Sequence, residues 1–179
     1  MPIGPKKLLE LVKQQKLVEN LSEREITNPE GAGFDLRAGE FYEITGEGFL
    51  GIDERKTTDS KLVAKYINNK KTSLIIKPGK YYLIRTVEAL NLPANIIAYP
   101  FSRGTLSRCG VLLLTNQVNP GYCGQLTFGI ANLGSCPMEI ELGARVAHIT
   151  FEYVKGGGNA YRGQWQGGRV SAVEKEKQV

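Results

Sequence analysis

Metal-ligating residues are scarce in this 179-residue sequence, which contains one histidine and three cysteines. Cys109, Cys123 and Cys136 form no C-x-x-C pair, and no H-x-E pattern is present, so the usual zinc sites lack ligands. An odd number of widely spaced cysteines also argues against a disulfide framework. The histidine, His148, lies in the apolar run 146–151, where we expect a packed core or interface side chain.

Long apolar runs are also absent. No stretch approaches the about 18 consecutive apolar residues of a membrane helix, and the first 25 positions mix Lys and Arg with Glu. The sequence therefore predicts no membrane span and no signal peptide, and we expect a cytoplasmic protein.

The net charge of +5 is local, because residues 61–120 are strongly basic whereas residues 31–60 are acidic. A basic segment indicates nucleic acid, nucleotide phosphates or a solvated face. The dense Lys/Arg runs and interleaved aromatics of a nucleic-acid module are absent, so we expect no nucleic-acid partner.

Glycine and proline are frequent, with 21 Gly and 8 Pro. Leucines recur at helical spacing after Pro5, which predicts one short helix over residues 5–18. After Gly31, short apolar runs alternate with turn signals such as Lys77-Pro78-Gly79 and Asn119-Pro120-Gly121. The expected strands are 41–44, 73–76, 81–86, 96–99, 111–114, 125–131, 138–142 and 146–154. This pattern predicts a mainly β fold, an antiparallel sandwich, barrel or jelly roll.

Two segments fall outside the strand pattern. Residues 46–69 are rich in charge and weakly periodic, so we expect an insertion or a long loop there. Residues 156–179 carry a Gly-Gly-Gly run and a later Gly-Gly pair, which predict a flexible C-terminal arm. The expected organisation is one β domain over residues 1–155 followed by this arm.

Residues 100–108 combine two arginines, three hydroxyl side chains and a glycine, in the order Pro-Phe-Ser-Arg-Gly-Thr-Leu-Ser-Arg. Arginine can bind a phosphate with two hydrogen bonds, hydroxyl and backbone N–H groups can donate to it, and glycine permits close backbone approach. The segment therefore fits an oxyanion site, and it also fits a polar turn between two strands.

Two further segments could contact a nucleotide. Residues 115–122, Thr-Asn-Gln-Val-Asn-Pro-Gly-Tyr, carry amides that could contact a base edge, although Asn-Pro-Gly is first of all a turn. Residues 161–169 place the only tryptophan, Trp165, between Arg162 and Arg169 in a glycine-rich tail. Such an arm can close over a nucleotide by stacking and phosphate contact, or it can be a strand exchanged between subunits.

Taken in order, these motifs resemble those of the trimeric dUTPase and dCTP deaminase superfamily. The matching segments are Ala32 to Ala38 (first motif), Lys77 to Pro93 (middle strands), Arg103 to Arg108 (phosphate motif), Asn119 to Gln125 (substrate hairpin) and Gly143 to Ile149 (the next motif). The leading helix and Trp165-Gln166-Gly167 look more like the deaminase branch, whereas residues 32–38 look more like the dUTPase branch. The resemblance implies an antiparallel β-barrel or jelly-roll fold of the dUTPase type.

The resemblance also implies a homotrimer in which each site is shared between subunits and the C-terminal arm closes over a deoxynucleoside triphosphate. Magnesium would bind through the triphosphate oxygens rather than in a protein cage, which fits the lack of a carboxylate cluster. The nucleotide-binding residues implied by the motifs are Arg103, Gly104, Thr105, Arg108, Asn116, Gln117, Asn119, Tyr122, Gln125, Trp165, Gln166 and Arg169.

The sequence departs from the superfamily at the positions that carry its chemistry. Asn119 stands where the hairpin has an aspartate that activates water in dUTPases, and an amide cannot take a proton from water. Gly129 stands where the deaminases have a glutamate that transfers protons, and Gly104 replaces a phosphate-motif serine. No Asp or Glu occurs between Ala89 and Met138, so the segment expected to hold the general base contains no carboxylate.

Three functions remain open. The leading hypothesis is dUTP hydrolysis to dUMP and pyrophosphate, in which Asn119 orients the water. The alternatives are a catalytically inactive nucleotide-binding or regulatory homologue and a dCTP deaminase. Asp35 and Glu88 are the nearest carboxylates that a neighbouring subunit could present as a substitute base, and for Asp35 we also expect a structural hydrogen-bonding role.

Overall fold

The short apolar runs that follow Gly31 pair into one antiparallel sheet. The structure is a computed structural model that describes residues 1–178. The hydrogen-bonded order is β8-β12-β2-β7-β10-β9, with β1 paired to β7 and β5 paired to β2. The bounds of these strands are β1 Val18–Glu19, β2 Gly33–Thr45, β5 Asp59–Lys65, β7 Tyr81–Asn91, β8 Ile96–Ser102, β9 Val111–Leu114, β10 Cys123–Asn132 and β12 Arg145–Tyr153.

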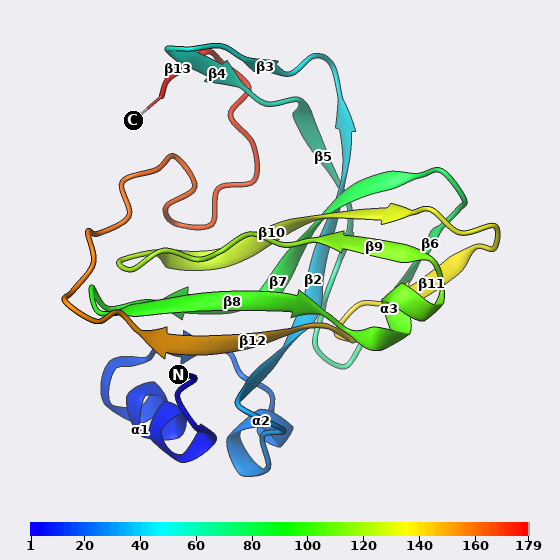
Figure 1. Cartoon of the computed structure of the whole chain (residues 1–179). Coiled ribbons are helices and arrows are strands. Elements are labelled where there is room, and N and C mark those ends of the chain that lie inside the picture. The colour runs from blue at the N-terminus through cyan, green and yellow to red at the C-terminus, as the bar shows by residue number, and fades with distance from the viewer. Residues whose placement is uncertain (179) are drawn as a thin grey trace.

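The two ends of this sheet meet and nearly close it into a barrel (Figure 1). Ala98 of β8 and Val118, which follows β9, exchange both backbone hydrogen bonds, at N···O distances of 3.1 and 2.9 Å. Closure of this kind removes the exposed edges that an open sheet would present. The predicted mainly β, antiparallel barrel is confirmed.

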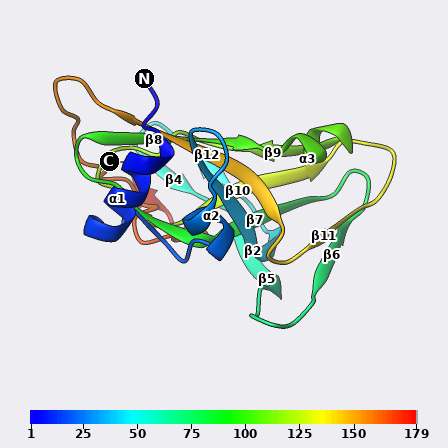
Figure 2. The same cartoon turned by 90° about the horizontal axis from the view of Figure 1, so that it is seen from below.

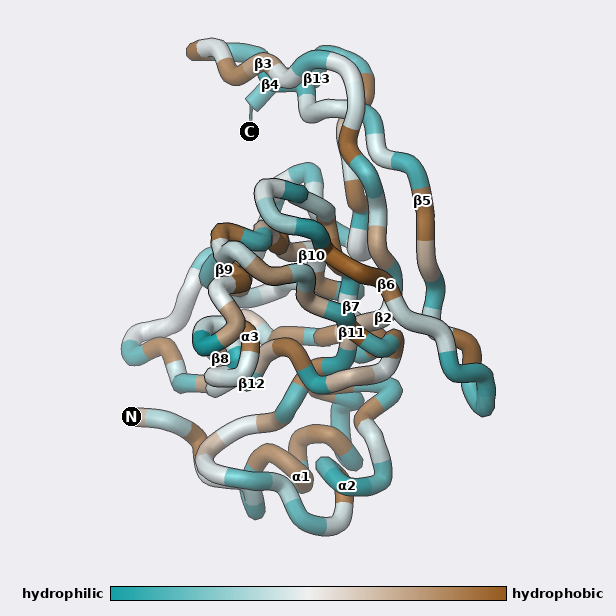
Figure 3. The backbone as a smooth tube through the Cα atoms, turned by 90° about the vertical axis from the view of Figure 1, so that its right-hand side faces the viewer, coloured by the Kyte–Doolittle hydropathy of each residue, from teal (hydrophilic) through white to brown (hydrophobic). Residues whose placement is uncertain are grey.

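The core fills the inside of the barrel. Phe34, Phe41, Ile84, Ile130 and Phe151 are fully buried, and the rings of Phe34 and Phe151 meet edge to face at 6.2 Å between centroids. Figure 3 shows how hydrophobic and hydrophilic residues alternate along the strands that supply these side chains. This alternation is what the period-2 pattern of a half-buried strand requires.

Three short helices accompany the barrel: α1 Pro5–Gln15, α2 Glu23–Thr27 and α3 Gly104–Arg108. Helix α1 buries Leu8 and Leu11 and ends where Lys16 adopts a left-handed conformation at φ 54°, so it is shorter than the predicted segment. Helices α1 and α2 lie side by side under one end of the barrel (Figures 1 and 2). No helix within residues 1–178 is long and apolar enough to cross a membrane.

Residues 46–69, for which an insertion or a long loop was expected, contain the strands β3 Phe49–Leu50, β4 Glu54–Lys56 and β5. Periodicity is weak there because β5 is exposed or only half-buried along its whole length. Strand β13, Glu176–Lys177, pairs with β4, so the C-terminus lies against this excursion (Figure 1). A separate two-stranded sheet joins β6, Ser73–Ile76, to β11, Met138–Glu141.

Candidate functional site

A cavity of about 590 Å³ lies where the hairpin before β10, the C-terminal arm and strand β7 converge. Tyr81 and Leu83 of β7 form part of its floor, together with Thr127 and Gly129 of β10. These four residues share one face of the sheet, because Gly129 is the register partner of Leu83 and side chains alternate between faces along a strand. The floor is therefore built on rigid, paired backbone.

The hairpin before β10 places four predicted site residues in the cavity wall: Asn116, Gln117, Asn119 and Tyr122. The side-chain amide of Gln117 donates to Asn119 Oδ1 at 2.7 Å, which fixes the orientation of both amides. Gly121 takes the left-handed conformation at φ +78° that the turn requires. The hairpin therefore presents oriented neutral amides to the cavity.

Tyr122 ties this hairpin to the barrel. Its hydroxyl donates to the backbone carbonyl of Gln125, and its ring meets that of Tyr161 edge to face at 5.5 Å between centroids. Burial is the main cause that raises the pKa of Tyr122 to about 12, so the phenol keeps its proton at neutral pH. Tyr122 therefore stays a neutral phenol in the cavity wall.

The C-terminal arm, residues 156–178, docks on the same hairpin. Gln166 accepts from the Cys123 N–H and donates to the Gly121 carbonyl, both at 3.0 Å, and Gly167 N–H donates to the Cys123 carbonyl at 2.7 Å. A Cβ on Gly124 would lie 2.4 Å from the Gly168 nitrogen, so only glycine permits this approach. These contacts bring Trp165 and Arg169 into the cavity wall, whereas the flexibility of the arm stays a prediction.

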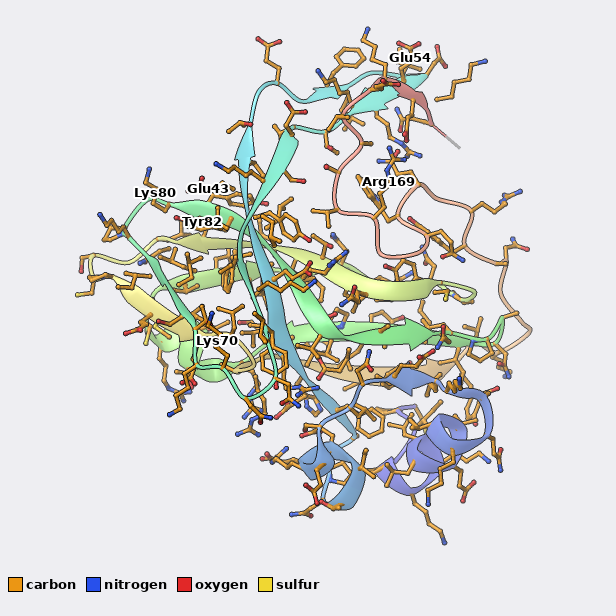
Figure 4. All side chains as sticks on the ribbon, turned by 180° about the vertical axis from the view of Figure 1, so that it is seen from behind. Glu43, Glu54, Lys70, Lys80, Tyr82 and Arg169 are labelled. Atoms are coloured by element: carbon orange, nitrogen blue, oxygen red, sulfur yellow. The ribbon has the colours of Figure 1, made fainter. Side chains whose placement is uncertain are left out.

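Arg169 is the one charged side chain in the cavity wall formed by residues 1–178, and no carboxylate lines it there. Its Nη2 pairs with Glu176 at 2.6 Å, and its Nε donates to the Ser171 carbonyl at 2.9 Å. Figure 4 shows Arg169 on the arm, beneath the β3–β4 hairpin that carries Glu54. The cavity wall therefore carries no negative charge of its own, and an anionic ligand would compete with Glu176 for the Arg169 guanidinium.

The excursion at residues 46–69 also reaches the cavity, to which it contributes Thr57 and Thr58. Thr57 N–H donates to the Ala172 carbonyl at 2.9 Å, and Ala172 N–H donates to Thr57 Oγ1 at 2.7 Å. Ala172 is fully buried in this contact. No sequence motif marks these residues, because only the fold brings the excursion and the arm together.

The phosphate motif lies elsewhere in the same chain. Its residues belong to α3 and its N-cap, and none of them lines the cavity: Arg103 is the N-cap, Gly104 and Thr105 begin the helix, and Arg108 ends it. The Arg108 side chain folds back over Gly104, and its Nη1 lies 2.8 Å from the position that a Cβ on Gly104 would take. Gln125 does not line the cavity either, and its side-chain amide donates to the Thr86 carbonyl at 2.9 Å. The structure therefore divides the predicted site residues into two groups.

Asp35 and Glu88, the two candidate substitute bases, are each only 1% exposed and lie outside the cavity wall. The Asp35 carboxylate contacts Arg103, Arg145 and His148 at 2.8 to 2.9 Å. Burial raises the pKa of Glu88, and the backbone and side-chain hydrogen bonds from Arg37 oppose that shift without cancelling it. In residues 1–178 no group of three or more His, Cys, Asp or Glu side chains is placed to hold a metal ion.

A family model described as dCTP deaminase-like matches residues 4–154. The chain belongs to this family. Among members of the dCTP deaminase-like family, it is 30% identical over 169 residues to the dCTP deaminase of Pyrococcus furiosus, with 94% of this chain and 96% of the relative covered. It is 33% identical over 147 residues to the dUMP-forming dCTP deaminase of Coprothermobacter proteolyticus, with 80% and 77% covered.

Solved structures support the same fold. A dCTP deaminase from Agrobacterium tumefaciens aligns with a TM-score of 0.65 at 16% identity over 86% of this chain, which spans 48% of that longer chain. A mutant dUTPase from phage phi11 of S. aureus aligns with a TM-score of 0.50 at 16% identity, covering 76% of this chain and 89% of that one. Both similarities concern the fold alone.

Within this dCTP deaminase-like chain, the space beside Gly129 is already filled. A Cβ on Gly129 would lie 2.3 Å from the Tyr81 hydroxyl oxygen and 3.1 Å from Leu114 Cδ1. A larger side chain at this position would therefore require Tyr81 to move. Tyr81 was not predicted as a site residue, because one aromatic residue in a strand carries no signal of its own.

Proposed function

We propose that the protein binds a deoxypyrimidine nucleoside triphosphate in this cavity and does not deaminate the base. One observation carries the proposal: the wall contributed by residues 1–178 presents oriented amides, a tryptophan and an arginine but no carboxylate. Deamination of the pyrimidine ring needs a group that moves protons, and loss of such a group typically lowers the rate by about 10²–10⁴-fold. Binding needs none.

The wall residues have complementary roles in this proposal. Asn116, Gln117 and Asn119 offer amide donors and acceptors to the base and sugar. Trp165 supplies a flat apolar surface against which a base or sugar can pack, and Arg169 supplies positive charge for phosphate oxygens.

A second copy of the chain completes the site in this proposal. Arg103, Thr105 and Arg108, the implied phosphate ligands, are absent from the cavity wall of their own chain. A homotrimer of the kind that the sequence resemblance implies would place the α3 segment of one subunit beside the hairpin of the next. Size-exclusion chromatography with light scattering tests this point, and a monomeric mass in the presence of nucleotide contradicts it.

In this proposal magnesium binds only together with the nucleotide. The cavity wall offers Mg²⁺ amide and hydroxyl oxygens but no carboxylate, so the residues present do not fit a resident ion. The cation would instead bridge triphosphate oxygens and reduce their charge.

Hydrolysis of dUTP to dUMP and pyrophosphate is the second candidate function. The hydrogen bond from Gln117 favours it, because it holds the Asn119 amide in one orientation in which the side chain could position a water. The names of the relatives favour dCTP deamination instead, and Gly129 opposes that activity because it leaves no proton acceptor at the position that the resemblance assigns to the base.

Titrations of the purified full-length chain with dUTP, dCTP, dTTP and dATP in the presence of Mg²⁺ test these proposals. Trp165 is the only tryptophan and lies in the cavity wall, so its fluorescence reports occupancy directly. Chromatography of the same mixtures scores pyrophosphate release and deamination. Binding of a pyrimidine nucleotide without deamination is expected, whereas formation of dUTP or dUMP from dCTP overturns the proposal. Release of pyrophosphate from dUTP alone establishes the second function.

A further inference from the structure

The cavity floor contains two hydroxyl-bearing side chains, Tyr81 and Thr127, close to Gly129. Tyr81 reaches over Gly129 from β7, and Thr127 lies two residues before it on β10, so both side chains are on the face that lines the cavity. The Thr127 hydroxyl is buried and has no hydrogen-bond partner within residues 1–178. An unpaired buried hydroxyl costs about 1–3 kcal/mol, so it marks a place where a polar ligand atom would be stabilising.

We propose that Tyr81 is the residue that contacts the pyrimidine base, with its hydroxyl in the space that a side chain at position 129 would otherwise occupy and with Thr127 beside it. This inference rests on the proposed function, since it assigns one role within that binding site. It adds a specificity residue that was not among the site residues expected from the sequence.

The chemistry of the two hydroxyls fits a neutral base edge. Burial raises the pKa of Tyr81, so the phenol stays protonated at neutral pH and can donate one hydrogen bond and accept others. A hydroxyl can donate to a ring carbonyl or accept from an exocyclic amine, and in neither case does it remove a proton from water. The Tyr81 hydroxyl can therefore contact the base, but it cannot act as the proton acceptor that deamination needs.

A purely structural role for Tyr81 makes a different prediction. An aromatic ring that crosses a glycine on the neighbouring strand shields the glycine backbone, and this effect needs only the ring. The hydroxyl group therefore separates the two roles, because Tyr81→Phe keeps the ring and removes the oxygen.

Tyr82 provides the matched control. It is the next residue on β7, faces the opposite side of the sheet, and packs edge to face on Phe41 at 6.4 Å between centroids. Figure 4 shows Tyr82 beside Glu43 and Lys80, apart from Arg169. Tyr82→Phe removes one phenol hydroxyl from the same strand without altering the cavity.

The experiment measures dissociation constants of wild type, Tyr81→Phe and Tyr82→Phe for dUTP, for dCTP and for inorganic tripolyphosphate, which lacks a base. Loss of one hydrogen bond to the base should weaken the tighter-binding nucleotide about 3- to 10-fold in Tyr81→Phe and leave tripolyphosphate unchanged. Tyr82→Phe should match wild type with all three probes.

The alternative results are distinct. Equal nucleotide affinity in wild type and Tyr81→Phe overturns the role of Tyr81 while leaving the proposed function intact, and so does equal weakening of nucleotide and tripolyphosphate. Failure of the wild type itself to bind any pyrimidine nucleotide overturns the proposed function. Gly129→Ala adds an independent test, because its Cβ would displace the Tyr81 hydroxyl and should weaken the nucleotide but not tripolyphosphate.

Discussion

Arg103 Nη1 lies 2.9 Å from Asp35 Oδ1, so the cation expected to bind phosphate is held by one of the two carboxylates considered as a substitute base. Asp35 also contacts Arg145 and His148, and its backbone N–H donates to the buried Glu25 carboxylate at 2.9 Å. One buried carboxylate thus holds Arg103, at the N-cap of α3, together with Arg145 and His148 of β12. Asp35 is placed to orient Arg103 rather than to face a substrate.

Asp35→Asn should lower the free energy of unfolding by about 2–3 kcal/mol, because the surrounding arginines would lose a charged partner in a largely buried setting. Urea unfolding measures the change. Asp59→Asn, which alters an exposed carboxylate, is the control and should leave stability unchanged. An Asp35→Asn variant that is as stable as wild type would contradict this structural role of the carboxylate.

Asn119→Asp should introduce pyrophosphate release from dUTP, or raise any release the wild type shows by about 10²-fold, because a carboxylate can accept a proton from water where an amide cannot. The Gln117 amide that donates to Asn119 Oδ1 can donate equally to an aspartate, so the new group would be held in place. Gln117→Ala in the same background should reduce the gain. No gain in a folded, nucleotide-binding variant would show that position 119 does not limit the reaction.

Glu40→Gln should make the free energy of unfolding less sensitive to acidic pH. Burial raises the pKa of Glu40, but hydrogen bonds from Tyr42 and Lys65 and the charge of Arg85 outweigh it and lower the pKa overall. The ionised Glu40 carboxylate therefore stabilises the folded state fully above the ordinary carboxyl pKa of about 4.3. This stabilisation is lost as the pH falls through the lowered pKa of Glu40.

Unfolding of wild type and Glu40→Gln at pH 7 and at pH 3 measures this effect. We expect the variant to be about 2 kcal/mol less stable at pH 7 and the gap to shrink in acid. The exposed residue Glu43 supplies the control, Glu43→Gln. A difference in stability between wild type and Glu40→Gln that is the same at pH 7 and pH 3 would contradict a lowered pKa of Glu40.

Thr57→Val should loosen the C-terminal arm, since the buried Ala172 N–H would lose its acceptor. An unpaired buried donor costs about 1–3 kcal/mol, which would shift the arm toward its detached state. Hydrogen exchange of residues 161–172 should then be faster and nucleotide affinity weaker. Thr57→Ser retains the hydroxyl and should behave as wild type, and equal exchange in all three proteins would count against the contact.

The fold could be predicted because its determinants are local. Turn residues such as Asn119-Pro120-Gly121 and the alternation of apolar residues in the strands locate most of the barrel in the sequence, and the leucines after Pro5 locate α1. Helix α2 was missed because it has five residues, too few for a periodic pattern. The family resemblance seen in the ordered motifs is confirmed by the match over residues 4–154.

The candidate site could be predicted only in part. Motifs identified the hairpin residues and Trp165, which the structure brings into one cavity. Thr57 and Tyr81 could not be identified, because their roles depend on long-range pairing: Thr57 meets the arm, and Tyr81 crosses Gly129. The roles assigned to the site residues stay predictions until ligand binding is measured.

The pairing of β13 with β4 joins positions separated by most of the chain, since Glu176 is the partner of Arg55. Contacts between such distant segments carry a high entropic cost of loop closure, so they form late in folding and open early on heating. We therefore expect this side of the cavity to be among the last parts of the molecule to assemble. Because a bound ligand stabilises the state that binds it, the nucleotide concentration would set the fraction of time that β13 stays paired with β4.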